Sequence, residues 1–257
     1  MVITPALARR TLAALDLTCL DEDASPDRIE ALCRAAHGRF GDVAAVCVYP
    51  EYITSARRSL IALGASAIRV ATVTNFPDGS DDPARAVRET RRAVAAGADE
   101  VDVVFPWRAL LDGYEQPGRD LVGGCREACG ERAKLKVILE TGHLAGPALI
   151  RQASEVAIAA GADFIKTSTG KAAVNATSGA AVIMLKAIRD HGGECGFKAA
   201  GGIRRLSDAA RYFDIADRML GPGWATPERF RIGASSLVDE VLEVLGEEAP
   251  STVDAGY

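Results

Sequence analysis

Short runs of apolar residues alternate along this chain with longer segments in which apolar residues recur every three or four positions. The short runs have the length and composition of strands that are buried on both faces of a parallel sheet, and the longer segments have the period of amphipathic helices. The predicted strands cover residues 15–20, 43–49, 68–74, 100–105, 135–140, the run around Lys166, 195–200 and 230–233.

Helices are predicted between these strands. Ser25-Pro26 and Asp82-Pro83 each combine a capping side chain with proline at the first helical position, which is a typical helix start. Eight strand and helix units in succession predict a single-domain (β/α)8 TIM barrel over residues 1–245, followed by a flexible tail at 246–257. A doubly wound open sheet is the alternative, disfavoured because no Gly-x-Gly-x-x-Gly follows an early strand. The predicted helices cover residues 26–37, 51–63, 83–96, 121–132, 147–160, 178–191, 207–216 and 237–245.

Composition and charge exclude several classes of function. The formal net charge of -5 argues against a broad basic surface for nucleic acid, and no apolar run approaches the length of a membrane span. The N-terminus lacks a signal-peptide pattern, so a cytoplasmic location is expected by default. Six cysteines without Cys-x-x-Cys spacing and only three histidines predict reduced thiols and no metal site.

An internal repeat marks two of the predicted strands. Residues 95–102 match residues 159–166, each running from a helix end through Gly-Ala-Asp into a strand. Asp102 and Lys166 therefore occupy the same place in two copies of one unit. A solvent-facing pair at a strand end is the less favoured interpretation.

The lysines point to chemistry, because only six of the thirty basic residues are lysine. Arginine stays protonated, whereas a lysine that is buried near another cation can lose its proton and act as a nucleophile. We predict that Lys166 is the nucleophile, that Lys198 is the cation that lowers its pKa and assists proton transfer, and that Asp102 is the general acid/base, acting directly or through water. Lys136 is the rival nucleophile, but its position in the strand pattern favours a polar lining or an ion pair.

Three consecutive loops after strands predict a phosphate site. Glycines allow backbone N–H groups to approach an anion, serine and threonine hydroxyls and a lysine add hydrogen bonds, and a helix begins just beyond the last loop. The predicted binding residues are Thr169, Gly170, Lys171, Gly201, Gly202, Gly233, Ser235 and Ser236.

Six motifs in this order resemble deoxyribose-phosphate aldolase, a class I, Schiff-base aldolase, over residues 12–245. The motifs are DLT at 16–18, TVTNFP at 72–77, EVDVVFP at 100–106, FIKTSTGK at 164–171, GFK at 196–198 and GASS at 233–236.

The resemblance implies reversible cleavage of 2-deoxy-D-ribose 5-phosphate to acetaldehyde and D-glyceraldehyde 3-phosphate, with no metal or organic cofactor. It implies the Schiff-base role for Lys166, the acid/base role for Asp102, proton transfer by Lys198 and supporting places for Asp16 and Thr18. The expected partners are therefore a small sugar phosphate and an aldehyde, without nucleic acid or membrane, and a homodimer is expected because family members are often dimers. Ala199 departs from the family pattern, where proline commonly follows the lysine.

Two other functions stay open. One is a different Schiff-base barrel, such as an aldolase with a ketone donor or a transaldolase. The other is a barrel that binds a sugar phosphate as a sensor without turnover. Two side hypotheses are that Cys47 is a buried structural thiol, rather than one that reacts with aldehydes, and that Tyr257 folds over the barrel mouth, with fraying as the alternative.

Overall fold

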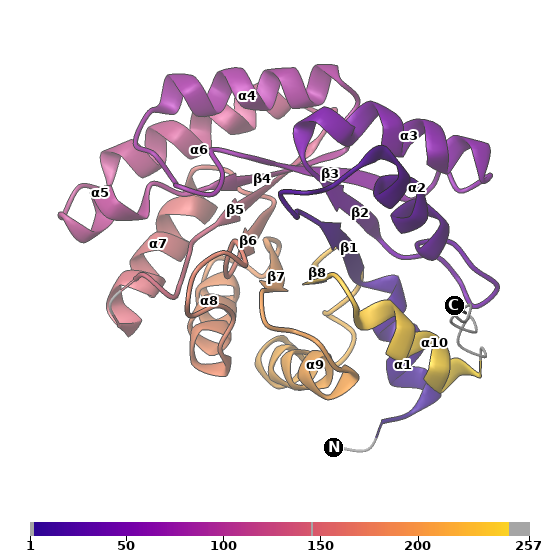
Figure 1. The fold of residues 1–257 in the computed structure, drawn as a ribbon. Coiled ribbons are helices and arrows are strands. Elements are labelled where there is room, and N and C mark those ends of the chain that lie inside the picture. The colour runs from indigo at the N-terminus through magenta and orange to yellow at the C-terminus, as the bar shows by residue number, and fades with distance from the viewer. Residues whose placement is uncertain (1–2, 145, 247–257) are drawn as a thin grey trace.

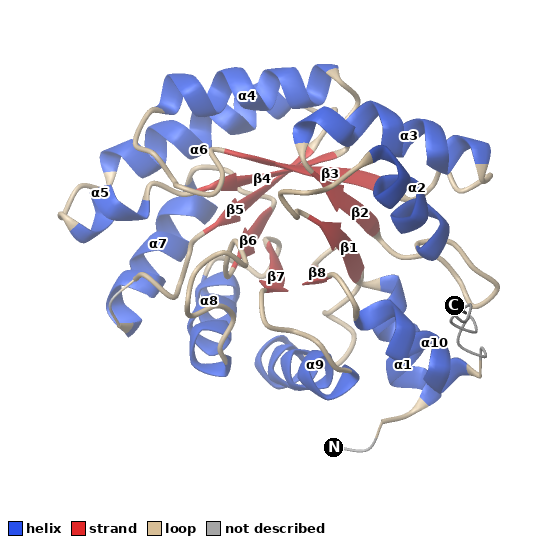
Figure 2. Ribbon diagram, in the orientation of Figure 1, coloured by secondary structure: helices blue, strands red, loops and turns tan. Residues whose placement is uncertain are grey.

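Eight parallel strands close into a barrel in sequence order, with helices around it, in the computed structural model (Figures 1 and 2). The structure describes residues 3–144 and 146–246. The predicted (β/α)8 TIM barrel is confirmed, whereas the predicted tail and Tyr257 lie outside the described residues. The strands are β1 (Leu15–Cys19), β2 (Ala45–Val48), β3 (Arg69–Thr74), β4 (Glu100–Val104), β5 (Lys134–Ile138), β6 (Phe164–Lys166), β7 (Gly196–Ala200) and β8 (Phe230–Ala234).

The helices form the outer layer. All eight predicted helices are present, with α6 beginning one turn earlier and α9 ending one turn later than predicted. The helices are α1 (Pro5–Ala13), α2 (Pro26–Ala35), η1 (Pro50–Tyr52), α3 (Ile53–Ala62), α4 (Pro83–Ala95), α5 (Trp107–Leu111), α6 (Gln116–Cys129), α7 (Pro147–Ala159), α8 (Ser178–Asp190), α9 (Leu206–Leu220) and α10 (Leu237–Leu245).

Two elements were not predicted, the helix α1 and the short helix α5, whereas η1 overlaps the start of the helix predicted at 51–63. The start of α1 carries the same signal as two helices that were predicted, since Thr4 accepts a hydrogen bond from the Leu7 N–H at 3.2 Å and Pro5 follows. Helix α1 packs beside α10, where the two ends of the barrel domain meet (Figure 1). No helix in the described part of the chain is both long and apolar enough to cross a membrane.

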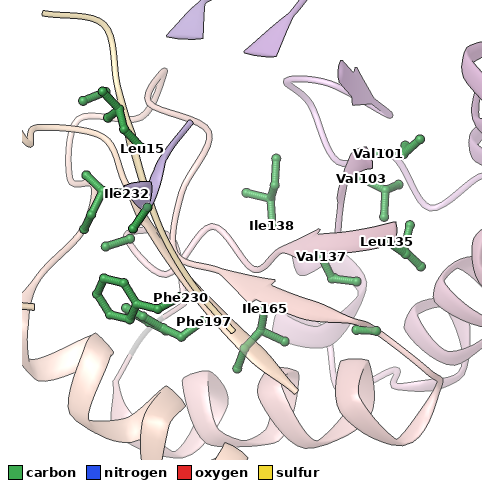
Figure 3. Packing of buried hydrophobic residues seen from close by; sticks show 14 of the residues in the cluster. Leu15, Val101, Val103, Leu135, Val137, Ile138, Ile165, Phe197, Phe230 and Ile232 are labelled. Atoms are coloured by element: carbon green, nitrogen blue, oxygen red, sulfur yellow. The ribbon is translucent and has the colours of Figure 1, made fainter. Parts of the chain in front are cut away.

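The two faces of each strand contribute to different layers, a hydrophobic layer between strands and helices and the interior of the barrel. Val101 and Val103 on β4, and Leu135 and Val137 on β5, lie fully buried in the main hydrophobic cluster between strands and helices (Figure 3). Because strand side chains alternate between faces, the residues between them, such as Asp102, point into the barrel. The hydrophobic layer outside the sheet thus leaves the barrel interior available for charged groups.

The internal repeat forms the same structure twice at the lower end of the barrel, where strands begin. Asp99 accepts a hydrogen bond from the Val70 N–H at 2.7 Å, and Asp163 accepts one from the Leu135 N–H at 2.7 Å. Each aspartate also pairs with an arginine of an earlier helix. These contacts fix the start of β4 and of β6 against the preceding strand, three residues before Asp102 and Lys166.

Candidate active site

The barrel interior holds a connected network of charged side chains, all almost completely buried. Every strand except β2 and β3 supplies at least one of them, on the face that points away from the helices. The network consists of Asp16 on β1, Glu100 and Asp102 on β4, Lys136 on β5, Lys166 on β6, Lys198 on β7 and Arg231 on β8.

Asp102 is the hub of this network. Its Oδ2 accepts hydrogen bonds from the Nζ atoms of Lys166 and Lys198, each at 2.8 Å, and its Oδ1 accepts one from the Nζ of Lys136 at 2.7 Å. Burial alone would raise the pKa of Asp102, but the three lysines outweigh it and hold the pKa well below its usual value. Asp102 is therefore an anion that three lysine amines contact.

The two lysines on Asp102 Oδ2 differ in acidity. Burial lowers the pKa of Lys166, and the nearby Lys198 lowers it further, while Asp102 opposes the shift. Burial would also lower the pKa of Lys198, but Asp102 and Asp16 outweigh it and raise that pKa. Lys198 donates to Asp16 Oδ2 at 2.5 Å as well as to Asp102, whereas Lys166 contacts one carboxylate. The amine of Lys166 thus gives up its proton more readily than the amine of Lys198.

Lys136 has a different environment. Its Nζ donates to Asp102 at 2.7 Å and forms an ion pair with Glu100 Oε2 at 2.5 Å, and its side chain is fully buried. Burial would lower its pKa, but the two carboxylates raise it. The ion-pair interpretation of Lys136 is confirmed, and an ammonium held in this way is a poor nucleophile.

A cavity of about 220 Å³ opens above Lys166 at the carboxyl ends of the strands. This is the end at which (β/α)8 enzymes build their sites. The loops after β6, β7 and β8 form its wall. Among the predicted site residues, Thr18, Lys166, Thr169, Gly170, Lys171, Gly201, Gly202, Gly233 and Ser235 line this cavity.

Backbone geometry explains two of the wall glycines. Gly201 has a φ of +85°, and a Cβ there would lie 2.7 Å from the side chain of Asn175. Gly233 lies inside the barrel, where a Cβ would approach Lys198 Cε to 3.1 Å. A side chain at either place would displace part of the site.

The remaining predicted loop residues are also held in definite ways. Lys171 Nζ donates to the Leu20 carbonyl at 2.7 Å, which ties the loop after β6 to the end of β1 across the mouth. Thr169 donates its hydroxyl to Glu140 at 2.5 Å. Ser236 is the residue before α10 and its hydroxyl makes no capping hydrogen bond.

Four functional candidates were missed by sequence reasoning. Arg204 lines the cavity directly after the Gly201-Gly202 turn, so its place after that turn was an available signal. Glu140 is buried with a left-handed φ of 54° and holds Thr169. Glu100 and Arg231 pair at 2.8 Å inside the barrel. Because strand side chains alternate between faces, Glu100 shares the inner face with Asp102, and Arg231 shares it with Gly233. The sequence therefore held a signal for both residues.

A larger cleft of about 710 Å³ lies at the opposite end of the barrel. Its walls include Arg57 and Arg126, which are paired with Asp99 and Asp163 of the repeat. These charges are already matched by structural partners. Lys134 also lines this cleft and burial lowers its pKa, but it is only half-buried, whereas the fully buried Lys166 lines the smaller cavity. The chemistry therefore belongs to the smaller cavity.

A (β/α)8 barrel with a lysine of lowered pKa beneath a small cavity is the arrangement of an enzyme that forms an imine with its substrate. The sequence model of the DeoC/LacD family of aldolases matches residues 11–236. The chain belongs to this family and is an aldolase, a lyase that makes and breaks carbon–carbon bonds.

Solved structures agree with this assignment. The apo form of a candidate deoxyribose-phosphate aldolase from Toxoplasma gondii ME49 matches with a TM-score of 0.86 and 26% identity, covering 96% of this chain and 98% of that one. A candidate deoxyribose-phosphate aldolase from Coccidioides immitis matches with a TM-score of 0.79 and 29% identity, covering 95% and 88%. The tetrameric deoxyribose phosphate aldolase from Aeropyrum pernix matches with a TM-score of 0.74 and 26% identity, covering 94% and 91%.

Proposed function

We propose that the protein reversibly cleaves 2-deoxy-D-ribose 5-phosphate to acetaldehyde and D-glyceraldehyde 3-phosphate, with Lys166 as the Schiff-base residue. The observation that carries the proposal is the environment of the Lys166 amine. It lies at the base of a cavity, its pKa is lowered by burial and by Lys198, and the far wall is built from glycine-rich loops. One end of the cavity suits an aldehyde and the other a phosphate.

The neutral amine of Lys166 adds to the C1 aldehyde, and the carbinolamine takes up a proton and loses water to give a protonated imine. The imine withdraws the electron pair of the C2–C3 bond as the C3 hydroxyl loses its proton, so that bond breaks and D-glyceraldehyde 3-phosphate leaves. The enamine that stays on Lys166 takes up a proton at C2, and water then releases acetaldehyde and the free amine.

Proton transfer falls to Asp102 and Lys198 in this scheme. Because Asp102 Oδ2 is 2.8 Å from both lysine nitrogens, it is placed to pass a proton between them, directly or through water. Its lowered pKa means that it does not retain the proton. The Lys198 ammonium is the local acid.

The phosphate anchors the other end of the substrate. The glycine turns supply backbone N–H groups, Lys171 and Arg204 supply positive charge, and the first turn of α10 supplies the positive end of a helix dipole. We assign the same role to the hydroxyls of Ser235 and Ser236. Binding energy from this remote group positions C1 against Lys166.

Trapping with acetaldehyde and borohydride tests the proposal. Peptide mass spectrometry should locate a two-carbon adduct on Lys166. Lys166→Met should abolish it, while Lys186→Met, which removes an exposed lysine on α8, should not. An adduct on Lys198 or Lys136 would overturn the assignment of roles. Efficient turnover with dihydroxyacetone phosphate but not with acetaldehyde would instead indicate a ketone-donor aldolase, and ligand binding without any adduct would indicate a sensor.

Two further properties stay predictions. We propose a homodimer, which light scattering of the purified chain tests, with the tetramer of the Aeropyrum pernix enzyme as the contrasting assembly. The cytoplasmic location expected from the sequence is tested by fractionation of cells that express the chain.

A further inference from the structure

Arg69, whose side chain is 37% exposed, pairs with Glu100 at 3.1 Å from the rim of the barrel. The fully buried part of the ion-paired network contains four cations and three carboxylates. Its cations are not equally compensated. Lys136 contacts Asp16, Glu100 and Asp102, whereas Lys198 contacts Asp16 and Asp102. The fourth cation, the Arg231 guanidinium, donates to Asp16 Oδ1 at 2.6 Å and to both oxygens of Glu100.

Lys166 is the cation with the fewest anions. Among the described residues its one carboxylate contact is with Asp102, and it shares the Oδ2 of Asp102 with Lys198. Glu140 is a further buried carboxylate, but it holds Thr169 and makes no ion pair with the network within the described residues. If one proton must leave the network to balance its charge, the amine of Lys166 is the group that loses least by giving it up.

We propose that Glu100 and Arg231 are positioning residues of the aldolase reaction, because the charge of this remote pair decides whether the Lys166 amine is held as the uncompensated, reactive member of the network. Neither residue reaches the cavity or touches substrate. The inference rests on the proposed role of Lys166 as the Schiff-base residue. It adds that two residues nearer the start of the strands set the reactivity of the Lys166 amine.

The strand register sets the distance over which this control acts. Lys166 pairs with Lys198 on β7, and Lys198 pairs with Arg231 on β8, so Arg231 lies two strands away from Lys166 in the strand register. Adjacent strands are about 4.8 Å apart, and two unit charges about 10 Å apart at an effective dielectric constant of about 20 shift a pKa by about one unit. Glu100 lies two residues before Asp102 on the same strand, at a comparable distance.

Other charged groups face Lys166, Glu100 and Arg231, and none of them is changed in the variants of the test. Lys166 faces Asp102, Lys198 and Cys47 on β4, β7 and β2. Glu100 and Arg231 face the network residues Asp16 and Lys136 and, at the lower rim, a set of half-buried or exposed groups. The rim groups are Arg69, Lys134 and Glu228.

The test measures the rate of cyanoborohydride trapping of acetaldehyde against pH, because only the neutral amine reacts. Arg231→Met removes a cation, so the pKa of Lys166 should rise and the midpoint of the acid limb should move up by about one pH unit. Glu100→Gln removes an anion, so the midpoint should move down by about one unit. The double variant keeps the original balance and should return the midpoint to the wild-type value.

A matched control is Arg10→Met. Arg231 binds Glu100 through two nitrogens and lies over the ring of Phe164. Arg10 likewise binds Asp217 through two nitrogens and lies over the ring of Phe213, but it does so in the outer helical layer. Its midpoint should equal that of the wild type. A loss of reactivity caused by general damage to the barrel would not give opposite shifts in two variants and cancellation in the third.

Unchanged midpoints, or shifts of one sign in both single variants, overturn the inference. If Arg231→Met does not fold, Glu100→Gln decides alone, since it keeps the size of the side chain and a downward shift is required. The wild type separates the two proposals. Without an adduct on wild-type Lys166 the proposed function itself fails, whereas a wild-type adduct with no opposite shifts removes only the role of Glu100 and Arg231.

Discussion

Replacing Lys198 with methionine should make Lys166 less reactive without breaking the network around it. Both lysine nitrogens lie 2.8 Å from Asp102 Oδ2. Two such bonds at an angle of about 115° place the nitrogens about 4.7 Å apart, where two unit charges repel by about 3.5 kcal/mol at an effective dielectric constant of about 20. That energy corresponds to about 2.6 pKa units.

The sign follows from which form reacts. Without the Lys198 charge the pKa of Lys166 rises, so at any pH below that pKa the neutral fraction falls. Water that enters the vacated space weakens the effect, and we expect an upward shift of about two units and about a hundredfold slower trapping of acetaldehyde at pH 7. The two carboxylates that Lys198 contacts keep other partners, Arg231 for Asp16 and Lys136 for Asp102, so the variant should fold.

The assay is the pH dependence of imine trapping, because turnover would also report the loss of Lys198 as an acid. Lys198→Arg serves as the control, since it keeps the charge and should leave the midpoint within a few tenths of a unit. A wild-type midpoint in Lys198→Met would refute the view that Lys198 tunes Lys166. Equal upward shifts in both variants would show that the shape of the side chain matters and its charge does not.

Three further results are expected. Gly233→Ala should lower kcat/KM about tenfold, because its Cβ would approach Lys198 Cε to 3.1 Å, while Gly179→Ala on α8, with open space at that position, should leave kcat/KM unchanged; equal activity of the two would refute the steric argument. Burial raises the pKa of Glu100, but Lys136 and Arg231 outweigh it and lower the pKa to about 2. The stability that Glu100 contributes is therefore present above its ordinary pKa of 4.5 and is lost as the pH falls toward 2. Between these pH values the urea midpoint of Glu100→Gln should fall less steeply than that of the wild type. Ellman's reagent should find no rapidly reacting thiol in the native protein and six in denaturant, because all six cysteines are buried and burial raises the pKa of Cys47; rapid native labelling would contradict this.

The fold was predictable because its strands are short apolar runs that recur at regular spacing between amphipathic segments. The strand that carries Lys166 and the one that carries Asp102 were found from apolar neighbours such as Ile165 and Val101, whose burial against the helices forces the charged residue inward. Helix ends were less accurate, as for the start of α6, where a proline lies in the first turn but Glu115 makes no capping hydrogen bond.

The site was predictable only in part. A lysine inside an apolar strand attracts attention, but Arg231 occupies an inner position near the start of β8, where it resembles the many arginines of the surface. Its importance depends on closure of the barrel, which brings β8 beside β1 and places Arg231 2.6 Å from Asp16, 215 residues away. No local pattern contains that contact. The division of acidity between Lys166 and Lys198 likewise depends on how many carboxylates each reaches, which is a property of the assembled interior.

The buried network divides unevenly along the chain. All three of its carboxylates lie on β1 and β4, in the first half of the barrel, and all four of its cations lie on β5 to β8, in the second half. Two copies of either half could not close around each other without enclosing charges of one sign, which is prohibitively unfavourable in a dry interior. The two halves are therefore electrostatically complementary, and the interior charges favour the pairing of unlike halves over the self-association of incomplete chains.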